Sequence, residues 1–520
     1  MKLRLGKFLL PLATAAMLAL PTQLSAQEQS GPKHHHYKLI DLGTFGGPSN
    51  IVAIEPTSTI INNAGVVVGA ADTSVPSPQV DCYNPVGNPD CFISHAYMWT
   101  DGILKDLGTL PGGSFSQANA INQWGQISGL SETDSFDPAT GNPEFHAVFW
   151  NNGKLRDLGT LGGTASASGN LNDFGQVTGI SLNAVPDPFS LLALGSGLTL
   201  TQTRGFFWQN GKIQDLGDLG GPDTWAVFVN DLGQVAGASY TSYEVDPNTG
   251  TPPVGVFLWQ NGRMKDIGNL GGDNGLLGAT QIVNGFNNRG DITGWMVLAG
   301  NQTAHAFLGN GEKLLDLGTL GGTFSFGRGV NDFGEATGLA TLPGDQVNHG
   351  FLWRNGTMID LGTLGGDPCS DAISVNDNGQ VVGASQSTAG GCNEWTTAFL
   401  WENGGSSVDL NSLVTSTSGA HLNVGLWTNA RGEIVAGGVL PGCEIAAENC
   451  GHTFLLVPCD ENHPHIEDCD YSLVETRATA KVPHADVAPA MAPSPIKPSF
   501  AELMDHCRSL LKRGNRGPLK

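Results

Sequence analysis

The sequence predicts an all-β fold, a closed β-propeller of eight four-stranded blades. Three observations support this prediction. One sequence unit recurs eight times along residues 37–458 of the 520-residue chain. Each unit carries four strand-like runs separated by turn signals. The two ends of the repeated region are incomplete in complementary ways. Abundant glycine (73 residues) and few charged residues (14%) also suit a chain with many tight turns, and they argue against a helical bundle or a disordered chain.

The clearest marker of the unit is an Asp-Leu-Gly-like step. Seven of the eight steps read Asp-(Leu/Ile)-Gly and most continue as DLGTLGG, whereas the last reads Asp409-Leu410-Asn411. The step aspartates are Asp41, Asp106, Asp157, Asp215, Asp266, Asp316, Asp360 and Asp409. Their spacing of 44 to 65 residues is typical of one propeller blade per unit.

Two further motifs define the strands within a unit. An Asn-x-x-Gly turn lies between apolar runs, as in INQWGQISG (121–129). A short aromatic run such as HAVFW (146–150) follows it. Such runs are rich in residues that suit strands. Several of the aromatic runs are followed by an Asn-Gly pair, at 152–153, 210–211, 261–262, 310–311 and 355–356. Such pairs favour two-residue hairpins, because both residues tolerate positive φ. The innermost strand is predicted to end near the turn asparagine, and the outermost strand to contain the step aspartate.

The ends of the repeated region predict how the ring closes. The first strand, Tyr37 to Gly43, has the sequence of a fourth strand but no blade before it. The last unit ends at His452 to Val457, a third strand with no fourth strand after it. Pairing the two would complete the eighth blade and remove open edges. An open β-solenoid, or a seven-bladed ring with one unit outside it, are the alternatives, and neither accounts for the complementary ends as well.

The recurring DLGTLGG, INxxGQVVG and HAFLW blocks resemble the bacterial extracellular repeats called the HAF family. The resemblance covers about residues 37 to 457. Single units depart from the pattern: Arg204, Gly255 and Thr397 occupy the histidine position, and Gly309 and Leu456 occupy the tryptophan position. The family has no established activity, catalytic residues or cofactor. The resemblance therefore implies an extracellular protein and leaves its function open.

Residues 1–26 predict a secretory signal peptide. Three basic residues precede the apolar run Phe8 to Leu20, and Leu24-Ser25-Ala26 offers small residues for cleavage after Ala26. That run is too short to span a bilayer, and no longer apolar run occurs, so no transmembrane segment is expected. We therefore expect a secreted protein, extracellular or periplasmic.

The formal net charge of the chain is -23. A negatively charged surface repels phosphate backbones, so nucleic acid is not an expected partner.

Eight of the nine cysteines fall into four pairs that are close in sequence. The predicted disulfides are Cys82/Cys91, Cys369/Cys392, Cys443/Cys450 and Cys459/Cys469. Cys507 is left over, either as a free thiol or as a bridge to another chain. The sequence holds no short CxxC-type zinc motif, and we predict no metal site, cofactor or catalytic residue.

The chain after the propeller divides into two segments. Residues 459–498 predict a disulfide loop and a Pro/Ala-rich linker. Residues 499–520 predict a short amphipathic helix with a basic tail, because Ser499 and Glu502 form a capping box and apolar residues recur at helical spacing. Arg508, Lys512 and Arg513 lie near the end of that helix. Residues 499–513 are expected to dock on a partner or an anionic surface, or else to pack on the propeller or fray.

Residues that recur once per unit are expected to be structural. The step aspartates should accept hydrogen bonds from turn amides or hydroxyls, and His95, His146, His305, His349 and His452 should pack within their blades, since a metal needs several ligands to converge. His34-His35-His36 should be a solvated terminus. Trp124, Trp225, Trp295, Trp395 and Trp427 break the regular tryptophan pattern and are the candidate aromatics of a ligand surface.

The segments between second and third strands vary most, and topology places them on one face together with the links between blades. They are residues 70–94, 130–145, 180–203, 238–254, 384–396 and 438–451. A rigid scaffold that presents varied loops is typical of a binding face. The sequence therefore predicts a secreted binding or interaction protein with a carbohydrate or protein ligand. Two alternatives stay open: an extracellular glycan hydrolase or lyase, which requires an acid/base pair that breaks the repeat, and a structural or assembly module.

Overall fold

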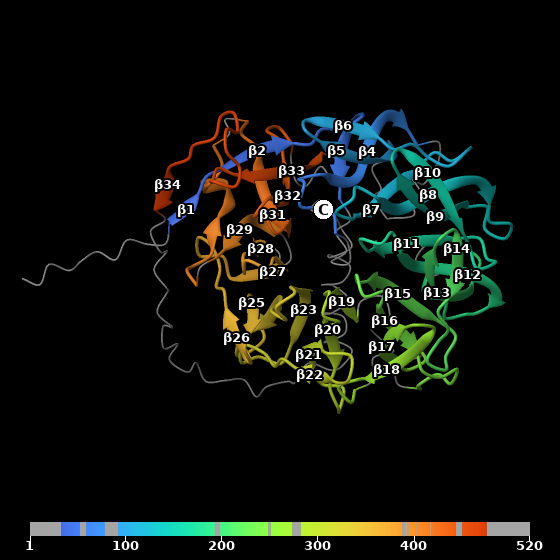
Figure 1. Ribbon diagram of the computed structural model, residues 1–520. Helices are drawn as coiled ribbons and strands as arrows, with labels where there is room; N and C mark the ends of the chain where they lie inside the picture. Colours follow the sequence, from blue (N-terminus) through green and yellow to red (C-terminus); the bar gives the residue numbers. More distant parts are fainter. Residues whose placement is uncertain are drawn as a thin grey trace, which may run out of the picture.

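The computed structural model describes residues 33–52, 59–77, 92–192, 198–247, 251–272, 282–386, 392, 395–402, 404–415, 418–443 and 450–475. The described strands form eight four-stranded sheets and one two-stranded sheet. The eight larger sheets follow one another around a ring, with the first strand of each blade nearest the centre (Figure 1). The predicted eight-bladed β-propeller is therefore confirmed.

Blades 1 to 4 are antiparallel meanders in chain order. Blade 1 contains β3 (Gly46–Ile51), β4 (Val67–Pro76), β5 (Phe92–Thr100) and β6 (Ile103–Asp106). Blade 2 contains β7 (Ser116–Ile121), β8 (Ile127–Phe136), β9 (Pro143–Asn151) and β10 (Lys154–Gly159). Blade 3 contains β11 (Ser166–Leu171), β12 (Val177–Pro186), β13 (Thr201–Gln209) and β14 (Lys212–Asp215). Blade 4 contains β15 (Thr224–Val229), β16 (Val235–Tyr240), β17 (Val254–Gln260) and β18 (Arg263–Gly268).

Blades 5 to 7 repeat that arrangement, and blade 8 draws its outer strand from the other end of the chain. Blade 5 contains β19 (Val283–Phe286), β20 (Ile292–Val297), β21 (Ala304–Gly309) and β22 (Leu314–Asp316). Blade 6 contains β23 (Ser325–Val330), β24 (Ala336–Thr341), β25 (Asn348–Arg354) and β26 (Thr357–Asp360). Blade 7 contains β27 (Cys369–Val375), β28 (Val381–Gln386), β29 (Trp395–Trp401) and β30 (Val408–Asp409), followed by the 3-10 turn η4 (Leu410–Ser412). Blade 8 contains β31 (His421–Thr428), β32 (Ile434–Val439), β33 (Gly451–Pro458) and β2 (Tyr37–Asp41).

The ring closes in blade 8 as the sequence predicts. β2 pairs antiparallel with β33, so that Tyr37 lies opposite Pro458 and Asp41 lies opposite Phe454. The blade thus unites strands from both ends of the repeated region, and the edge of β33 is paired where an open ring would leave it bare. Tyr37 is buried with Leu413, Leu422 and Phe454 in the core of this blade.

A second pairing holds the start of the described chain. β1 (Lys33–His35) pairs with β34 (Leu473–Glu475) beyond the last blade. His34 is fully buried, and its Nδ1 lies 2.8 Å from Oε1 of Glu402. The expectation of a solvated histidine run is therefore wrong for His34. A three-residue strand that pairs with another strand far along the chain leaves no periodic pattern in the sequence, so only the folded structure reveals it.

A closed circle of hydrogen bonds joins all eight blades at the turn between first and second strands. In each blade, Nδ2 of the turn asparagine donates to the main-chain carbonyl of the equivalent asparagine in the next blade, over 2.7–3.2 Å. In ring order these residues are Asn62, Asn122, Asn172, Asn230, Asn287, Asn331, Asn376 and Asn429, and Asn429 donates back to Asn62.

Both ends of each side-chain amide are used in this circle. Oδ1 of Asn122, for example, accepts the N–H groups of Trp124 and Gln126 within its own turn, while its Nδ2 serves the next blade. Aspartate would supply the acceptor without the donor. The recurrence of asparagine in the sequence therefore has a physical cause, because one amide shapes the turn and joins the blades.

The hydrophobic core lies between neighbouring blades. The Phe149 ring lies 5.4 Å from that of Trp208, and the Phe207 ring lies 5.3 Å from that of Trp259, so aromatic residues of one third strand pack on those of the next. The third-strand tryptophans at 99, 150, 208, 259 and 401 are buried, and the sixth, Trp353, is half-buried and packs on the core. Gly129 shows how close the packing is: a Cβ there would lie 1.9 Å from the carbonyl oxygen of Gln117 and 2.8 Å from the Trp150 ring.

Candidate functional site

The propeller has two faces of different character. The turns between first and second strands and between third and fourth strands lie on one face, which we call the turn face. The loops between second and third strands and the links between blades lie on the other, the loop face. On the turn face, Asn152, Asn210, Asn261 and Asn355 and the glycines after them all have positive φ, as two-residue hairpins require. Asn310 differs, because its Oδ1 accepts the N–H groups of Glu312 and Lys313 in a longer turn.

Blades 1 to 3 carry longer hairpins on the loop face than the other blades. Their second strands β4, β8 and β12 have 10 residues each, whereas the second strands of blades 4 to 8 have 6. Pairing with the third strand continues to Pro76, Phe136 and Pro186, across a register shift near the end of each strand. The raised hairpins of three adjacent blades make the loop face asymmetric.

The predicted loop boundaries are therefore wrong at their ends. The segment from Ser131 to Phe136 lacks alternating apolar residues and so resembles a loop in the sequence, although Ser131, Glu132 and Phe136 still pair with the third strand. The segment 238–254 also includes Tyr240 and Val254, which are buried in the core. In blade 4, β16 ends at Tyr240 and β17 begins at Val254, so replacement of the whole of 238–254 would remove core contacts.

Apolar side chains are exposed at the loop-face ends of these blades. Their exposed fractions are 52% for Val75, 60% for Phe136, 50% for Val185 and 65% for Tyr243. They come from blades 1, 2, 3 and 4, which are neighbours in the ring. Clustered exposed apolar residues on a folded protein are typical of a contact surface.

Asp137 fastens the raised hairpin of blade 2 to blade 3. Its carboxylate accepts six hydrogen bonds: from Ala139 N, Thr140 N and Thr140 Oγ1 in its own turn, and from Thr164 Oγ1, Thr199 N and Thr199 Oγ1 in blade 3. Partial burial opposes ionisation, yet the hydrogen bonds from Thr199 and from the turn amides hold the pKa of Asp137 well below its ordinary value. The carboxylate thus holds the hairpin in one orientation.

Asp187 occupies the equivalent position in blade 3 but meets a second carboxyl group. Its Oδ1 accepts the N–H of Phe189, and among the described residues no N–H or O–H group donates to its Oδ2. The neighbouring Asp223 in blade 4 accepts the N–H groups of Thr203 and Leu191, both over 2.8 Å. Burial, together with the charge of Asp187, raises the pKa of Asp223. We infer that Asp223 keeps a proton at neutral pH and shares it with the neighbouring carboxyl of Asp187.

This pair breaks the repeat, as the acid/base pair of an enzyme would. Asp223 stands where Phe115, Ala165 and Phe324 precede the first strands of other blades. However, Asp223 is fully buried and Asp187 is 4% exposed, so neither side chain lies on an open surface. The sequence analysis missed the pair because the two residues lie in different blades and neither belongs to a motif.

The step aspartates behave as predicted and have an additional partner. In each of the first seven steps Oδ1 accepts the N–H of the glycine two residues later, and in the eighth that of Asn411. In five blades the carboxylate also bonds Nδ1 of the third-strand histidine over 2.8–3.0 Å. The pairs are His95–Asp106, His146–Asp157, His305–Asp316, His349–Asp360 and His452–Asp41.

The histidines therefore tie the third strand to the fourth in their own blades. Burial opposes ionisation of Asp157, but the hydrogen bond from His146 and that from Gly159 N hold its pKa below the ordinary value. In blade 3 Arg204 takes the histidine position and bonds Asp215 instead. A spacing of eleven residues between histidine and aspartate, present in four of the five pairs, was the sequence signal for this contact.

The five candidate surface tryptophans separate into different environments. Trp124 is 75% exposed on the turn face. Trp295 is fully buried against Phe324 and Phe326, so the expectation that it belongs to a ligand surface is wrong. Trp225, Trp395 and Trp427 are half-buried and pack against the inter-blade core. An apolar residue outside the repeat pattern can fill a local gap in the core, which the sequence does not distinguish from exposure.

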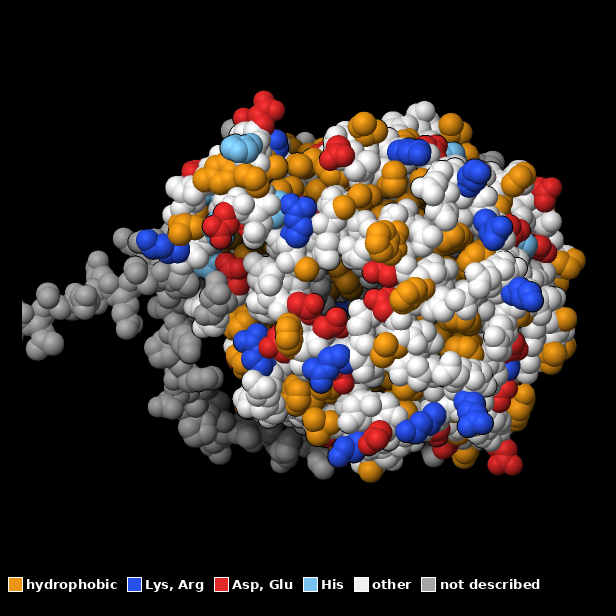
Figure 2. All heavy atoms as spheres, in the orientation of Figure 1, with side chains coloured by type: hydrophobic (Ala, Val, Ile, Leu, Met, Phe, Trp, Pro, Cys, Tyr) orange, Lys and Arg blue, Asp and Glu red, His pale blue; other side chains and the backbone are white. Residues whose placement is uncertain are grey.

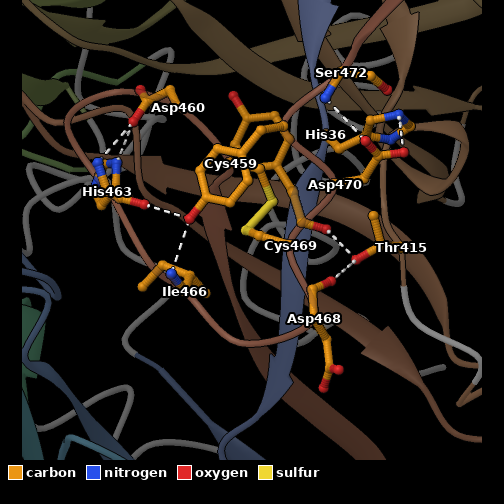
Figure 3. The surroundings of a disulfide bond; sticks show 12 residues. His36, Thr415, Cys459, Asp460, His463, Ile466, Asp468, Cys469, Asp470 and Ser472 are labelled. Atoms are coloured by element: carbon orange, nitrogen blue, oxygen red, sulfur yellow. Dashed lines mark hydrogen bonds and ion pairs between the residues drawn. A yellow bond between two sulfur atoms is a disulfide. The ribbon is translucent and has the colours of Figure 1, made fainter.

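Three of the predicted disulfides are present: Cys369–Cys392, Cys443–Cys450 and Cys459–Cys469. Cys82 and Cys91, like Cys507, lie outside the described residues. Figure 3 shows the Cys459–Cys469 loop, in which His463 bonds Asp460 and His36 lies by Asp470. Cys443–Cys450 spans the loop between β32 and β33, and Cys369–Cys392 ties the first strand of blade 7 to its second–third loop. These two bonds brace segments of the loop face.

An ion pair lies between the first strands of blades 6 and 7. Nη2 of Arg328 on β23 is 2.8 Å from Oδ2 of Asp371 on β27, and the guanidinium also lies over the Phe326 ring. Asp371 is 1% exposed.

Within the described part of the chain, no group of three or more His, Cys, Asp or Glu side chains is placed to hold a metal ion. No helix in the same residues is long and apolar enough to cross a membrane.

No protein-family model matches the chain, and the comparison with curated proteins gives no significant match. Among solved structures, the chain is similar to the β-propeller domain of the Trilobed protease from Pyrococcus furiosus, with 8% identity, a TM-score of 0.39, and coverage of 72% of this chain and 98% of that one. It is also similar to Pyrococcus horikoshii acylaminoacyl peptidase (9% identity, TM-score 0.40, 79% and 58% coverage) and to Trypanosoma rangeli sialidase (9%, 0.32, 81% and 59%). The chain thus spans little more than half of the last two. The fold assignment rests on the eight sheets themselves, and these similarities do not bear on activity.

Proposed function

We propose that the mature protein is a secreted binding scaffold whose loop face contacts an extracellular carbohydrate or protein. The observation that carries this proposal is the raised, braced set of hairpins on blades 1 to 3. Ten-residue strands extend all three hairpins, and the six hydrogen bonds on Asp137 fix the hairpin of blade 2 against blade 3. Phe136 and Val185 stay exposed near the ends of their hairpins. A surface that is rigid before binding loses little conformational entropy when it associates.

Secretion is part of the same proposal. The predicted signal peptide directs export, and three disulfides suit an oxidising compartment because cytosolic thiols are kept reduced. The resemblance to HAF repeats supports an extracellular location. The enzyme alternative receives no support from the Asp187–Asp223 pair, because both carboxyls are buried.

The proposal is tested by a binding screen followed by matched substitutions. The full mature chain is screened against an array of extracellular polysaccharides and a panel of secreted proteins. Phe136→Ser combined with Val185→Ser changes the loop face, and Phe174→Ser, at a residue 71% exposed on the turn face, is the control. Loss of apolar anchors should weaken binding by about tenfold or more, and the control should bind as the wild type does. Binding that survives the loop-face change but is lost in the control would overturn the proposal.

A further inference from the structure

The turn face carries an unusual set of exposed apolar residues around the centre of the ring. They stand at the third position of the Asn-x-x-Gly turns. In each turn the asparagine Oδ1 binds the N–H of this residue, as it does for Trp124 and Phe174. The turn is thereby held in one shape, and the side chain at this position is exposed in several blades. The exposed fractions are 75% for Trp124, 71% for Phe174, 59% for Leu232 and 66% for Phe333.

The second position of the same turns carries carboxylates that are held in place. Asp173 Oδ1 accepts the N–H of Gln123 from the preceding blade, and Asp231 Oδ1 accepts that of Asp173. Asp332 Oδ1 accepts the N–H of Asn288 in the same way. We call the second and third residues of these turns the inner rim. Figure 2 shows acidic and hydrophobic side chains around the hollow at the middle of the ring.

The charge of the inner rim is predominantly negative. Burial raises the pKa of Asp173, and the negative charge of the neighbouring Asp231 adds to the rise. Arg289 and Arg431 take the third position in blades 5 and 8, where they lie 3.7 and 3.6 Å from Asp291 and Glu433 of their own turns. Lys105, Lys154 and Lys212 follow the outer turns, farther from the axis. A partner that matches the rim of blades 2 to 4 is therefore apolar along one side and cationic along its border.

The chain itself contains a segment with that composition. The sequence of residues 499–513 predicts an amphipathic helix with Phe500, Leu503 and Leu510 on its apolar side, and Arg508, Lys512 and Arg513 are its basic residues. Residues 476–498 connect it to the end of β34. An extended Pro-rich linker of this length reaches about 70 Å, whereas a compact unit of this size has a radius of gyration of about 22 Å. The segment is therefore able to reach the inner rim from β34.

We propose that residues 499–513 dock on the inner rim of the turn face, covering the apolar side chains of blades 2 to 4 and pairing their basic residues with Asp173 and Asp231. The site takes one amphipathic cationic helix, supplied by the same chain. The loop face stays free for the ligand of the proposed function, because the two faces lie on opposite sides of the ring.

Hydrogen exchange of residues 499–513 in the full mature chain, measured by mass spectrometry, tests this docking. The rim variant combines Trp124→Ser, Phe174→Ser and Leu232→Ser, one residue from each of blades 2 to 4. The control variant combines Ile103→Ser, Phe136→Ser and Tyr243→Ser, whose side chains are 65%, 60% and 65% exposed away from the rim. All six residues are exposed, so folding should be unchanged, which circular dichroism and the melting temperature check.

Exchange in residues 499–513 should be about tenfold faster in the rim variant than in the wild type, and unchanged in the control, because a docked helix exchanges only when it detaches. Combined Asp173→Asn and Asp231→Asn should also accelerate exchange, and added salt should reduce the difference. Equal exchange in wild type and rim variant would overturn the proposal. Protection that rises with protein concentration would also overturn it, because the helix would then occupy a second copy of the chain.

Discussion

Replacing Asp187 by asparagine should stabilise the protein at neutral pH, whereas the same replacement at Asp137 should destabilise it. The two aspartates follow equivalent raised strands and each precedes a proline. Asp137 accepts from six N–H and O–H groups, whereas Oδ2 of Asp187 has no donor in the part of the chain that the structure describes and lies near the Asp223 carboxyl. The Asp187→Asn change keeps an oxygen for Phe189 N and brings an N–H group to Asp223. The Asp137→Asn change removes acceptor capacity that its turn and blade 3 require.

The sign of the pH dependence follows from Asp223. Burial, reinforced by the charge of Asp187, raises the pKa of Asp223 from 3.8 to about 8. The folded protein keeps this proton above pH 4, while the unfolded chain loses it. The contribution of this proton to stability is therefore complete below about pH 4 and is lost as the pH rises to about 8. At about 1.4 kcal/mol per unit, the free energy of unfolding should fall by up to about 4 kcal/mol between pH 4 and 7.

Urea unfolding followed by circular dichroism, at several pH values between 4 and 8, measures these effects. Asp187→Asn should recover about 1–3 kcal/mol at pH 7 and flatten the fall in stability, because the like charge is gone and a donor is present. Asp137→Asn should lose about 2–3 kcal/mol at pH 7. If Asp187→Asn destabilised the protein at pH 7 as Asp137→Asn does, or left the slope between pH 5 and 7 as steep as in the wild type, the shared-proton reasoning would be refuted.

Three further substitutions test the ring and its packing. Asn429→Asp removes the donor to Asn62 and places a carboxylate beside Glu433, so the free energy of unfolding should drop by about 2–3 kcal/mol. A loss below about 0.5 kcal/mol in urea unfolding would contradict a stabilising role for the circle of asparagine hydrogen bonds. His452→Ala breaks the pair across the closure and should speed hydrogen exchange in β2, whereas His305→Ala, the same pair in blade 5, should leave β2 unchanged; equal effects would argue against a role in closure. Gly129→Ala should lower the free energy of unfolding by more than about 2 kcal/mol, because the added Cβ would collide with a carbonyl oxygen and an aromatic ring. Gly141→Ala, where a Cβ meets open space at φ 75°, should lower it by only about 1 kcal/mol. Thermal melting measures both.

Local chemistry repeated eight times explains why so much of the fold was predictable. Asn-Gly at 152–153 predicts a hairpin because few residues tolerate two successive positive φ values, and the structure has that turn. The match between Tyr37 to Gly43 and the missing outer strand predicts closure, because an unpaired edge is costly. Three of the cysteine pairings also followed from spacing in the sequence. In each case the information lies within a short stretch or in its repetition.

Contacts between blades, in contrast, depend on residues that no local pattern relates. Asp187 and Asp223 belong to different blades. Because they lie close together in a buried site, Asp223 keeps its proton at neutral pH. His34 is buried because β1 pairs with a strand more than 400 residues away. The outer parts of the ten-residue strands of blades 1 to 3 were predicted as loops, because polar side chains there show no strand pattern although the main chain still pairs with the third strand. The sequence alone determined the repeat, the turns and the closure of the ring. Only the tertiary structure decided which polar groups are buried and which apolar side chains stay exposed to solvent, because burial depends on neighbours in space.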